Sequence, residues 1–506
     1  MRLNCVRMDC LSIACSAVIV LITFVYLIFK WKYSYWKVRG VQYLEPSFPL
    51  GNIPFKKIHF SKYFVDAFKY KQQTPLVGVY LFAVPVAVPI SLDLIQSILV
   101  KDFSSFHDRG AYVNEVDDPL SAHMFNLDGE KWKAVRTKLS PTFTSGKMKF
   151  MFSTVVEVVE RFNYTLANLI KVEPEVEVID LLERFTTDVI GSCAFGIECN
   201  SLEDPNFIFR YYGRKVSEVS PFRHLFVGAF PNLARRLHMR AVRKDVADFF
   251  IETVRKTIDY RVKNHIRRND FMDLLIDINK DSDESGEGAG TSKKLSLEDM
   301  AAQAFLFFVA GFETSSATMV FCLYELALNS DIQEKCRQEI NGVLTKYNGN
   351  LTYEAIKEMT YVDQTIKETL RQYPPIGFLI RKAVRDYPVP DTKVVIKKGM
   401  EVFIPLHRIH HDPEIYPNPE KFDPDRFSPE KVKNRHTESF LAFGDGPRHC
   451  VGQRFAKMQT RIGLTTLLKN YRFKTCEKTP VPMVFETFRG IISPKGSKLF
   501  LKVERI

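Results

Sequence analysis

FGDGPRHCVG, residues 443–452, is a short stretch built around a single thiol, Cys450. Its three glycines and one proline are typical of a tightly turned backbone. The chain has nine cysteines and no CxxC pair, and the cysteines nearest to Cys450 in sequence are Cys336 and Cys476. Zinc and iron–sulfur sites take several protein ligands at short spacing. The stretch therefore indicates a lone thiolate rather than a cluster of metal-binding cysteines.

A lone thiolate suits a metal whose other ligands come from a cofactor. Haem iron is such a metal, because the porphyrin supplies four nitrogens and leaves an axial position for the protein. We expect Gly444 and Gly446 to bring the backbone close to the ring and to aim amide groups at the sulfur. A helix is expected to begin near Val451, and its positive end would favour the thiolate. Arg448 is placed to pair with a haem propionate.

The same stretch matches the pattern Phe-x-x-Gly-x-Arg-x-Cys-x-Gly at every specified position. It thereby resembles the haem-binding signature of the cytochrome P-450 family. The resemblance implies one large haem-thiolate fold, mainly α-helical with a minor β portion. It also implies haem b as cofactor, Cys450 as the axial thiolate and metal ligand, and Phe443, Gly444 and Arg448 as further residues that bind the cofactor.

Two more motifs of the family occur upstream. ETLR, residues 368–371, places Glu368 and Arg371 on one face of an expected helix, where they can pair. PDRF, residues 424–427, supplies Arg426. The resemblance implies a buried triad of Glu368, Arg371 and Arg426 that holds the proline-rich segment beneath the haem. Such a buried ion pair is explained better by specificity than by net stability.

Other basic residues resemble the family's propionate ligands. WKAVR, residues 132–136, places Trp132 and Arg136 one helical turn apart. Arg381 follows the ETLR motif by ten residues. The resemblance implies that Trp132, Arg136 and Arg381 hold the haem propionates.

A long apolar helix is expected across the other face of the haem. Ser296 and Asp299 form a capping pair at its start. The sequence that follows contains AGFET, residues 310–314, where a Thr314 hydroxyl bonded to the preceding turn would bend the helix. The family has an acid and a threonine here, so the resemblance implies that Glu313 and Thr314 relay protons for oxygen activation. This pair favours monooxygenation over the rearrangement of peroxides.

The N-terminus predicts a membrane anchor over residues 1–30. Residues 11–29 are uncharged, and a helix of that length rises about 28 Å, close to the hydrocarbon thickness of a bilayer. The basic residues that follow place the body of the protein on the cytoplasmic side. A cleaved signal peptide is the alternative, which the long apolar run disfavours. Residues 31–55 are expected to be a basic and proline-rich linker, and residues 56–506 the catalytic domain.

The rest of the chain indicates a helical body with little sheet. Residues 76–100 alternate apolar and turn residues, which predicts a small sheet. Residues 232–373 contain no proline and repeat their apolar positions at helical spacing, interrupted by a polar, Gly- and Ser-rich loop over 280–294. Fourteen of the 26 prolines lie at or after Pro374, so turns, loops and short strands are expected there.

The formal net charge of +12 suits an acidic partner or a membrane surface. The basic residues are spread along the chain, which argues against nucleic acid as the partner. No GxGxxG fingerprint stands in a βαβ context, so electrons must come from another protein. The resemblance implies an NADPH–cytochrome P-450 reductase at the endoplasmic reticulum membrane, with a cytochrome b-type protein as an additional candidate donor. The candidate contacts for an acidic donor are Lys131, Lys133, Lys138, Lys147 and Lys149.

The expected substrate is a lipophilic small molecule, because the segments expected to form the pocket are rich in phenylalanine. The residues expected to contact it are Phe106, Phe125, Phe308, Ala310, Phe378 and Phe488. SPTFTSGKMKFMF, residues 140–152, and AGFETSS, residues 310–316, resemble the insect microsomal branch that oxidises plant toxins and insecticides. Oxidation of an endogenous hormone, fatty acid or pheromone is an open alternative. A haem protein that binds ligands or carries electrons without catalysis is another, although it would have no use for a proton relay.

Overall fold

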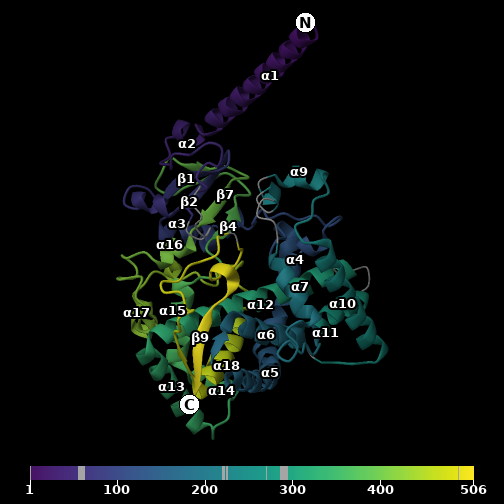
Figure 1. Ribbon diagram of the computed structural model, residues 1–506, viewed down its shortest axis with the longest axis vertical. Coiled ribbons are helices and arrows are strands. Elements are labelled where there is room, and N and C mark those ends of the chain that lie inside the picture. Colours follow the sequence, from purple (N-terminus) through teal and green to yellow (C-terminus); the bar gives the residue numbers. More distant parts are fainter. Residues whose placement is uncertain are drawn as a thin grey trace.

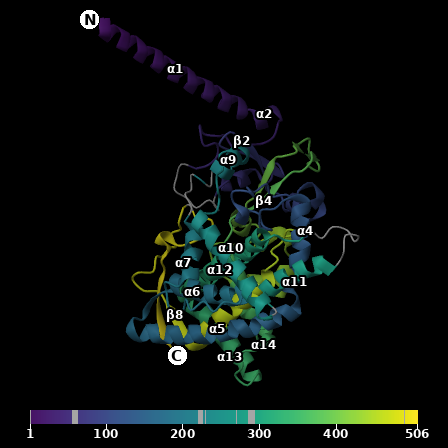
Figure 2. The ribbon, with the colours of Figure 1, turned by 90° about the vertical axis from the view of Figure 1, so that its right-hand side faces the viewer.

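The computed structural model describes residues 2–54, 63–218, 223, 226–228, 230–268, 270–284, 294–487 and 489–506. Within these residues the body is mainly helical and contains three small sheets, as the sequence predicts. The N-terminal helix α1 (Arg2–Lys32) projects away from the body (Figure 1), and the view at right angles shows the same projection (Figure 2).

Two helices of the described chain are long and apolar enough to cross a membrane, by length and composition alone. One is the segment Ser12–Val38, which is 0% buried and lies near the N-terminus. The other is α12 (Leu297–Leu328), which is mostly buried inside the body and is therefore a core helix. The exposed segment fits the membrane anchor expected from the sequence.

Part of the segment that was expected to be a basic and proline-rich linker, residues 31–55, packs on the first sheet. Trp36, in α2 (Tyr35–Val38), is 0% exposed, and its indole Nε1 donates to Val79 O at 3.1 Å. A Cβ on Gly78 would lie 2.4 Å from the Trp36 ring, so only a glycine allows this contact. Burial of the large indole ring explains why the segment joins the folded body instead of bridging to it.

The strands form short sheets at the margins of the helical body. In the four-stranded sheet the order is β1-β2-β7-β4, in which β2 and β7 are parallel and the other pairs are antiparallel. A three-stranded antiparallel sheet has the order β3-β9-β8, and β5 pairs with β6. The bounds are β1 Leu76–Leu81, β2 Val84–Pro89, β3 Glu175–Glu177, β4 Leu379–Lys382, β5 Tyr387–Pro388, β6 Val395–Ile396, β7 Glu401–Ile404, β8 Tyr471–Lys474 and β9 Phe500–Arg505.

Helices fill the long proline-free middle of the chain, as expected, and also cover much of the chain on either side. The remaining helices are α3 Leu92–Gln96, α4 Gly129–Leu139, α5 Ser145–Val172, α6 Val178–Ile190, α7 Ile208–Ser217, α9 Pro231–Arg236, α10 Lys244–Lys263, α11 Phe271–Glu284, α13 Ser330–Lys346, α14 Tyr353–Glu358, α15 Thr360–Gln372, α16 Leu406–His410, α17 Pro429–Lys433 and α18 Gln453–Asn470. The expected loop over 280–294 lies largely outside the described residues, and α11 extends to Glu284.

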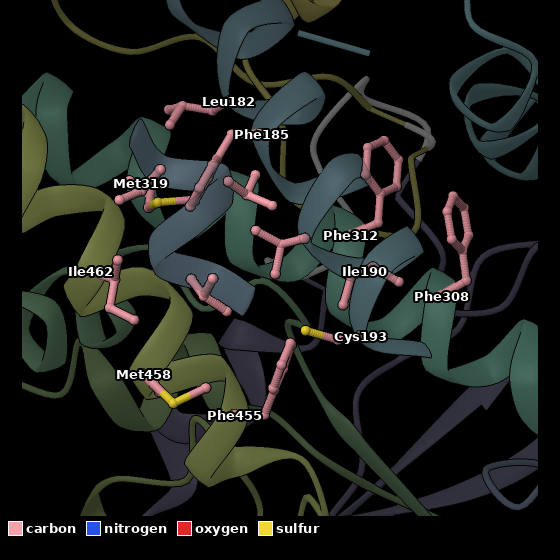
Figure 3. Close-up of a cluster of buried hydrophobic side chains, with 14 of the residues drawn as sticks. Leu182, Phe185, Ile190, Cys193, Phe308, Phe312, Met319, Phe455, Met458 and Ile462 are labelled. Atoms are coloured by element: carbon pink, nitrogen blue, oxygen red, sulfur yellow. The ribbon is translucent and has the colours of Figure 1, made fainter. Parts of the chain in front are cut away.

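Helix α12 begins at the predicted capping box and runs through the middle of the body (Figure 1). Ser296 Oγ accepts from Asp299 N, and Asp299 Oδ2 accepts from Ser296 N, each at 3.0 Å. Figure 3 shows apolar side chains of α6 and α18, including Ile190 and Phe455, gathered near those of α12, including Phe312. This packing makes α12 the centre of the hydrophobic core.

Gly311 lets α12 approach α6 closely. A Cβ on Gly311 would lie 2.3 Å from Cδ1 of Ile190, which is 0% exposed. The glycine that looks out of place in an apolar helix is therefore a packing residue. Because a helix packed this tightly cannot turn freely about its axis, the contact helps to set which of its residues face away from α6.

Candidate active site

The FGDGPRHCVG stretch forms a turn, called here the cysteine loop (residues 443–452). Cys450 N donates to Phe443 O at 2.8 Å, which closes the turn. Gly446 has a φ of +68°, a conformation that favours glycine, and a Cβ there would lie 1.9 Å from Leu99 O. The close approach seen at Gly446 is thus to the backbone of Leu99, whereas the sequence suggested an approach to the cofactor.

The Cys450 side chain faces a cavity inside the body. Burial raises the pKa of the Cys450 thiol, whereas the backbone N–H of Gly452 and the charges of Arg136 and Arg109 act to lower it. Gly452 is the residue before α18, whereas the sequence suggested Gly444 and Gly446 as the glycines that act on the sulfur. Iron would outweigh burial, because a thiol that coordinates a metal ion is deprotonated.

The cavity lies between α12 on one side and the cysteine loop with the start of α18 on the other. Its lining is mostly apolar and aromatic, and no aspartate or glutamate of the described chain is part of it. The residues expected from the sequence that line it are Phe125, Trp132, Arg136, Ala310, Thr314, Phe443, Gly444, Arg448 and Cys450.

Four arginines lie close enough at this site to repel one another: Arg109, Arg136, Arg381 and Arg448. Burial lowers the pKa of Arg448 to about 10, and burial together with the charge of Arg448 lowers the pKa of Arg381 to about 10. Burial followed by the charges of the other three also lowers the pKa of Arg109. The sequence analysis did not identify Arg109, because Arg109 belongs to no recognised motif. Arg109 Nη1 donates a hydrogen bond to Phe125 O at 2.8 Å.

Two of these guanidinium groups keep buried nitrogen atoms without a partner. Arg381 is 1% exposed and Arg448 3%, and neither Arg381 Nε nor Arg448 Nη1 has a hydrogen-bond partner in the described chain. A buried charge with unsatisfied donors is costly, so the cluster requires an anionic group with several acceptor oxygens. The two propionates of haem fit that requirement, and the thiol at the same site fits the iron.

Trp132 and Arg136 line the cavity from α4. The guanidinium carbon of Arg448 lies 4.1 Å from the centroid of the Trp132 ring, a cation–π contact. Arg448 Nε and Nη2 donate to the carbonyl oxygens of His107 and Leu127, each at 2.8 Å. Arg448 is thus held rigidly beside the cavity. Arg381 lies on β4 and does not line the cavity, but its charge acts on the other arginines of the site.

Glu368, Arg371 and Arg426 meet in the interior. Arg371 Nε and Nη2 lie 2.7 and 2.9 Å from the two carboxylate oxygens of Glu368, and both residues are 0% exposed. Arg426 Nε lies 3.3 Å from Glu368 Oε1. Arg371 also donates to His410 O at 2.8 Å and to Pro419 O at 2.7 Å. These bonds tie α15 to the proline-rich segment that carries Arg426.

Thr314 and Glu313 point from α12 in different directions. Thr314 lines the cavity, and its hydroxyl donates to Ala310 O at 2.6 Å, which is the back-bond expected from the sequence. Glu313 does not line the cavity, and its Oε1 accepts from Arg489 Nε at 2.9 Å. Successive residues of a helix diverge by about 100°, so the expected acid–threonine pair is not brought together at the cavity.

Comparisons with known proteins agree with this geometry. A family model described as Cytochrome P450 matches residues 44–501. The chain belongs to the cytochrome P450 family. It is 47% identical over 488 residues to Probable cytochrome P450 6a14 of Drosophila melanogaster, covering 94% of this chain and 96% of that protein. It is 46% identical over 485 residues to Cytochrome P450 6A1 of Musca domestica, covering 94% of each.

Membership of the cytochrome P450 family establishes a haem-thiolate monooxygenase and confirms the expected fold and enzyme class. The relatives named above are insect proteins of the P450 6A group, which matches the insect branch expected from the sequence.

Two of the residues expected to contact substrate lie where this P450 could use them. Ala310 lines the cavity one helical turn before Thr314. Phe125 lines it as well, with the guanidinium carbon of Arg109 at 3.9 Å from its ring centroid. Phe488 lies outside the described residues.

Three other phenylalanines that were expected to contact the substrate do not line the cavity. Phe106 is 0% exposed and packs edge-on against Tyr387, with ring centroids 4.8 Å apart. Phe378 packs against Phe403 at 5.0 Å. Phe308 is 0% exposed and turns into the core (Figure 3).

Counting helical turns back from Thr314 predicts the cavity-lining residues of α12 better than the phenylalanine content of the segment does. Ala310, Phe307 and Gln303 precede Thr314 by four, seven and eleven residues, and all of them line the cavity. The neighbouring Phe308 falls on the opposite side of the same helix.

Proposed function

We propose that this P450 oxidises uncharged lipophilic molecules, among them foreign compounds such as plant toxins or insecticides, with Cys450 as its iron ligand. The observation that carries the proposal is the cavity, which has the Cys450 sulfur on one wall, Thr314 on the opposite wall and apolar side chains between them. Without an acidic lining residue in the described chain, the cavity offers no counter-charge to a cationic substrate.

When bound, haem supplies the iron chemistry that activates O₂ and inserts one oxygen atom into the substrate. Cys450 would hold the iron, with Phe443 and Gly444 beside it in the loop. Trp132, Arg136 and Arg448 would hold the propionates, and Arg381 and Arg109 would add positive charge around them. Glu368, Arg371 and Arg426 keep the segment before the loop in place.

Electrons are proposed to come from NADPH through a membrane-bound reductase, with a cytochrome b-type protein as a second donor. Helix α1 would anchor the enzyme in the endoplasmic reticulum membrane with the body in the cytoplasm. Several lysines of the candidate docking cluster form exposed ion pairs, such as Lys131 with Glu115 at 2.5 Å and Lys149 with Glu354 at 3.2 Å. Exposed pairs of this kind are weak and can exchange for an acidic partner.

Reconstitution with an NADPH–P450 reductase tests the substrate class. We expect product from neutral lipophilic compounds, and at least about tenfold less from matched quaternary ammonium analogues, since a cation would lose its hydration in a cavity that has no acidic lining residue in the described chain. Mass spectrometry of a panel of such pairs, incubated with NADPH, measures the ratio. Equal turnover of both members of the pairs would contradict the proposal, and selective turnover of one hormone-like or fatty-acid compound would favour an endogenous role.

Thr314 is the proposed proton-delivery residue at the cavity. Its hydroxyl already donates to Ala310 O, so its lone pairs remain available to accept from a water. Glu313 is proposed as the acid that supplies protons to this group. Since its carboxylate is bound to Arg489, that role requires the ion pair to loosen.

Thr314→Ala is expected to keep haem and substrate binding but to lose coupling. Less product and more hydrogen peroxide should form per NADPH consumed, because a general acid–base contribution is typically about 10²–10⁴-fold and waters can replace part of it. The measurement is the ratio of product to NADPH. Thr318→Ala is the control, since Thr318 lines the same cavity one turn later and donates to Thr314 O at 2.8 Å. An unchanged ratio in Thr314→Ala would show that the hydroxyl only serves the helix.

A further inference from the structure

His410, at the end of α16, is 0% exposed and stands between two parts of the active-site support. Its backbone carbonyl accepts from Arg371 Nη1 at 2.8 Å. Its imidazole Nε2 accepts from Leu441 N at 3.0 Å. His410 therefore bonds both to Arg371 of the triad and to the chain that leads into the cysteine loop.

The imidazole of His410 is held in a single protonation state. Since Nε2 accepts a hydrogen bond, the ring proton of the neutral form is on Nδ1. Burial, together with the charges of His411 and Arg371, lowers the pKa of His410 to about 3, and the backbone of Arg371 and Leu370 acts in the opposite direction. At neutral pH the ring is therefore uncharged, and Nε2 is always available as an acceptor.

The hydrogen bond from Leu441 N–H to His410 restrains the backbone that leads to the Cys450 thiol. Leu441 is 1% exposed, so its N–H cannot exchange the His410 ring for bulk water. Leu441 O accepts from Gly444 N, and Phe443 O accepts from Cys450 N, each at 2.8 Å. The bond from His410 to Leu441 thus fixes the point at which the cysteine loop begins.

The ring of His410 is also fixed by stacking. It lies against the ring of Phe440, with centroids 5.4 Å apart and an interplanar angle of 19°. Phe440 immediately precedes Leu441, so stacking and hydrogen bonding act on neighbouring residues. This combination orients Nε2 toward one amide and leaves little freedom for another arrangement.

We propose that His410 is a positioning residue for the axial thiolate, acting through Leu441 N–H and the backbone of the cysteine loop. The proposal rests on the role of Cys450 proposed above. Without the Nε2 acceptor, a buried amide is left unsatisfied, and the loop can satisfy it only by shifting the backbone that carries the thiol. His410 touches neither substrate nor cofactor in this arrangement.

The test compares His410→Gln with His410→Asn in the full-length holoenzyme. A glutamine amide oxygen reaches the place of Nε2, whereas the shorter asparagine reaches only the place of Nδ1. We expect H410Q to keep the thiolate-type band of the reduced carbon monoxide complex. H410N should convert to the thiol-type band about tenfold faster on mild warming, the size of effect of one unsatisfied buried amide. Haem content and the unfolding midpoint are measured beside the spectrum.

The possible results distinguish failure of the positioning role of His410 from failure of the role of Cys450 as iron ligand. A wild-type enzyme without the thiolate-type band would overturn the role of Cys450 itself. With that band present in the wild type, equal conversion rates in H410Q and H410N would overturn the positioning role, as would haem loss in step with conversion. His411→Asn is the matched control, because His411 Nδ1 lies 2.8 Å from His407 O and not on the cysteine loop, and it should convert at the wild-type rate.

Discussion

Replacement of Cys450 by serine is expected to abolish the thiolate-type spectrum and NADPH-dependent monooxygenation together. A serine hydroxyl is nearly isosteric with the thiol but is a hard and weak ligand, whereas thiolate pushes electron density to the iron. The fold should persist, because the side chain faces the cavity and does not fill the core. The measurement is the difference spectrum of the reduced carbon monoxide complex, with product formation assayed on the same preparation.

Cys476→Ser is the matched control for that experiment. Cys476 is only partly exposed, its Sγ lies 3.5 Å from Thr479 Oγ1, and it does not line the cavity. This variant should keep both the spectrum and the activity. If the Cys450→Ser enzyme retained the thiolate-type band, another residue would have to be the ligand and the proposed site would be wrong.

The parts of the site that sequence predicted well are those encoded by short local patterns. The spacing of Glu368 and Arg371 puts them on one helical face, and the structure pairs them. The capping box at Ser296 begins α12 where expected. Such features depend on residues within one or two helical turns, so the chain elsewhere has little influence on them.

The parts that sequence missed depend on how elements meet in three dimensions. The rotation of α12 about its axis decides that Phe307 lines the cavity while Phe308 enters the core, and packing of Gly311 against Ile190 takes part in setting that rotation. Aromatic content alone cannot distinguish the two phenylalanines. The same rotation of α12 directs Glu313 toward Arg489 and away from the cavity.

Long-range contacts account for the remaining differences. Arg109 carries no motif and joins the arginine cluster only because its loop folds beside Arg448, to whose carbonyl it donates at 3.3 Å. Trp36 is anchored by a strand more than 40 residues away, through a contact with Gly78 and a bond to Val79. Neither contact leaves a signal at short spacing in the sequence.

Arg371→Ala is expected to prevent the enzyme from holding haem in a folded body. The change leaves the Glu368 carboxylate buried at 0% exposure without its main partner. It also removes the donors to His410 O and Pro419 O, so α15 loses its hydrogen bonds to the end of α16 and to the proline-rich segment. Removing one partner of a buried ion pair costs about 3–5 kcal/mol, a large share of a typical free energy of unfolding. Haem content per protein and the unfolding midpoint are the measurements.

Arg472→Ala provides the comparison at the surface. Arg472 lies 3.7 Å from Glu334, with both side chains nearly half exposed. An exposed pair contributes about 0–1 kcal/mol, so this variant should retain normal haem content. Arg371→Lys should fall between the two, because lysine keeps the charge but cannot donate to Glu368, His410 and Pro419 together. Arg371→Ala protein with full haem content and only slower turnover would show that Arg371 serves catalysis and not the fold.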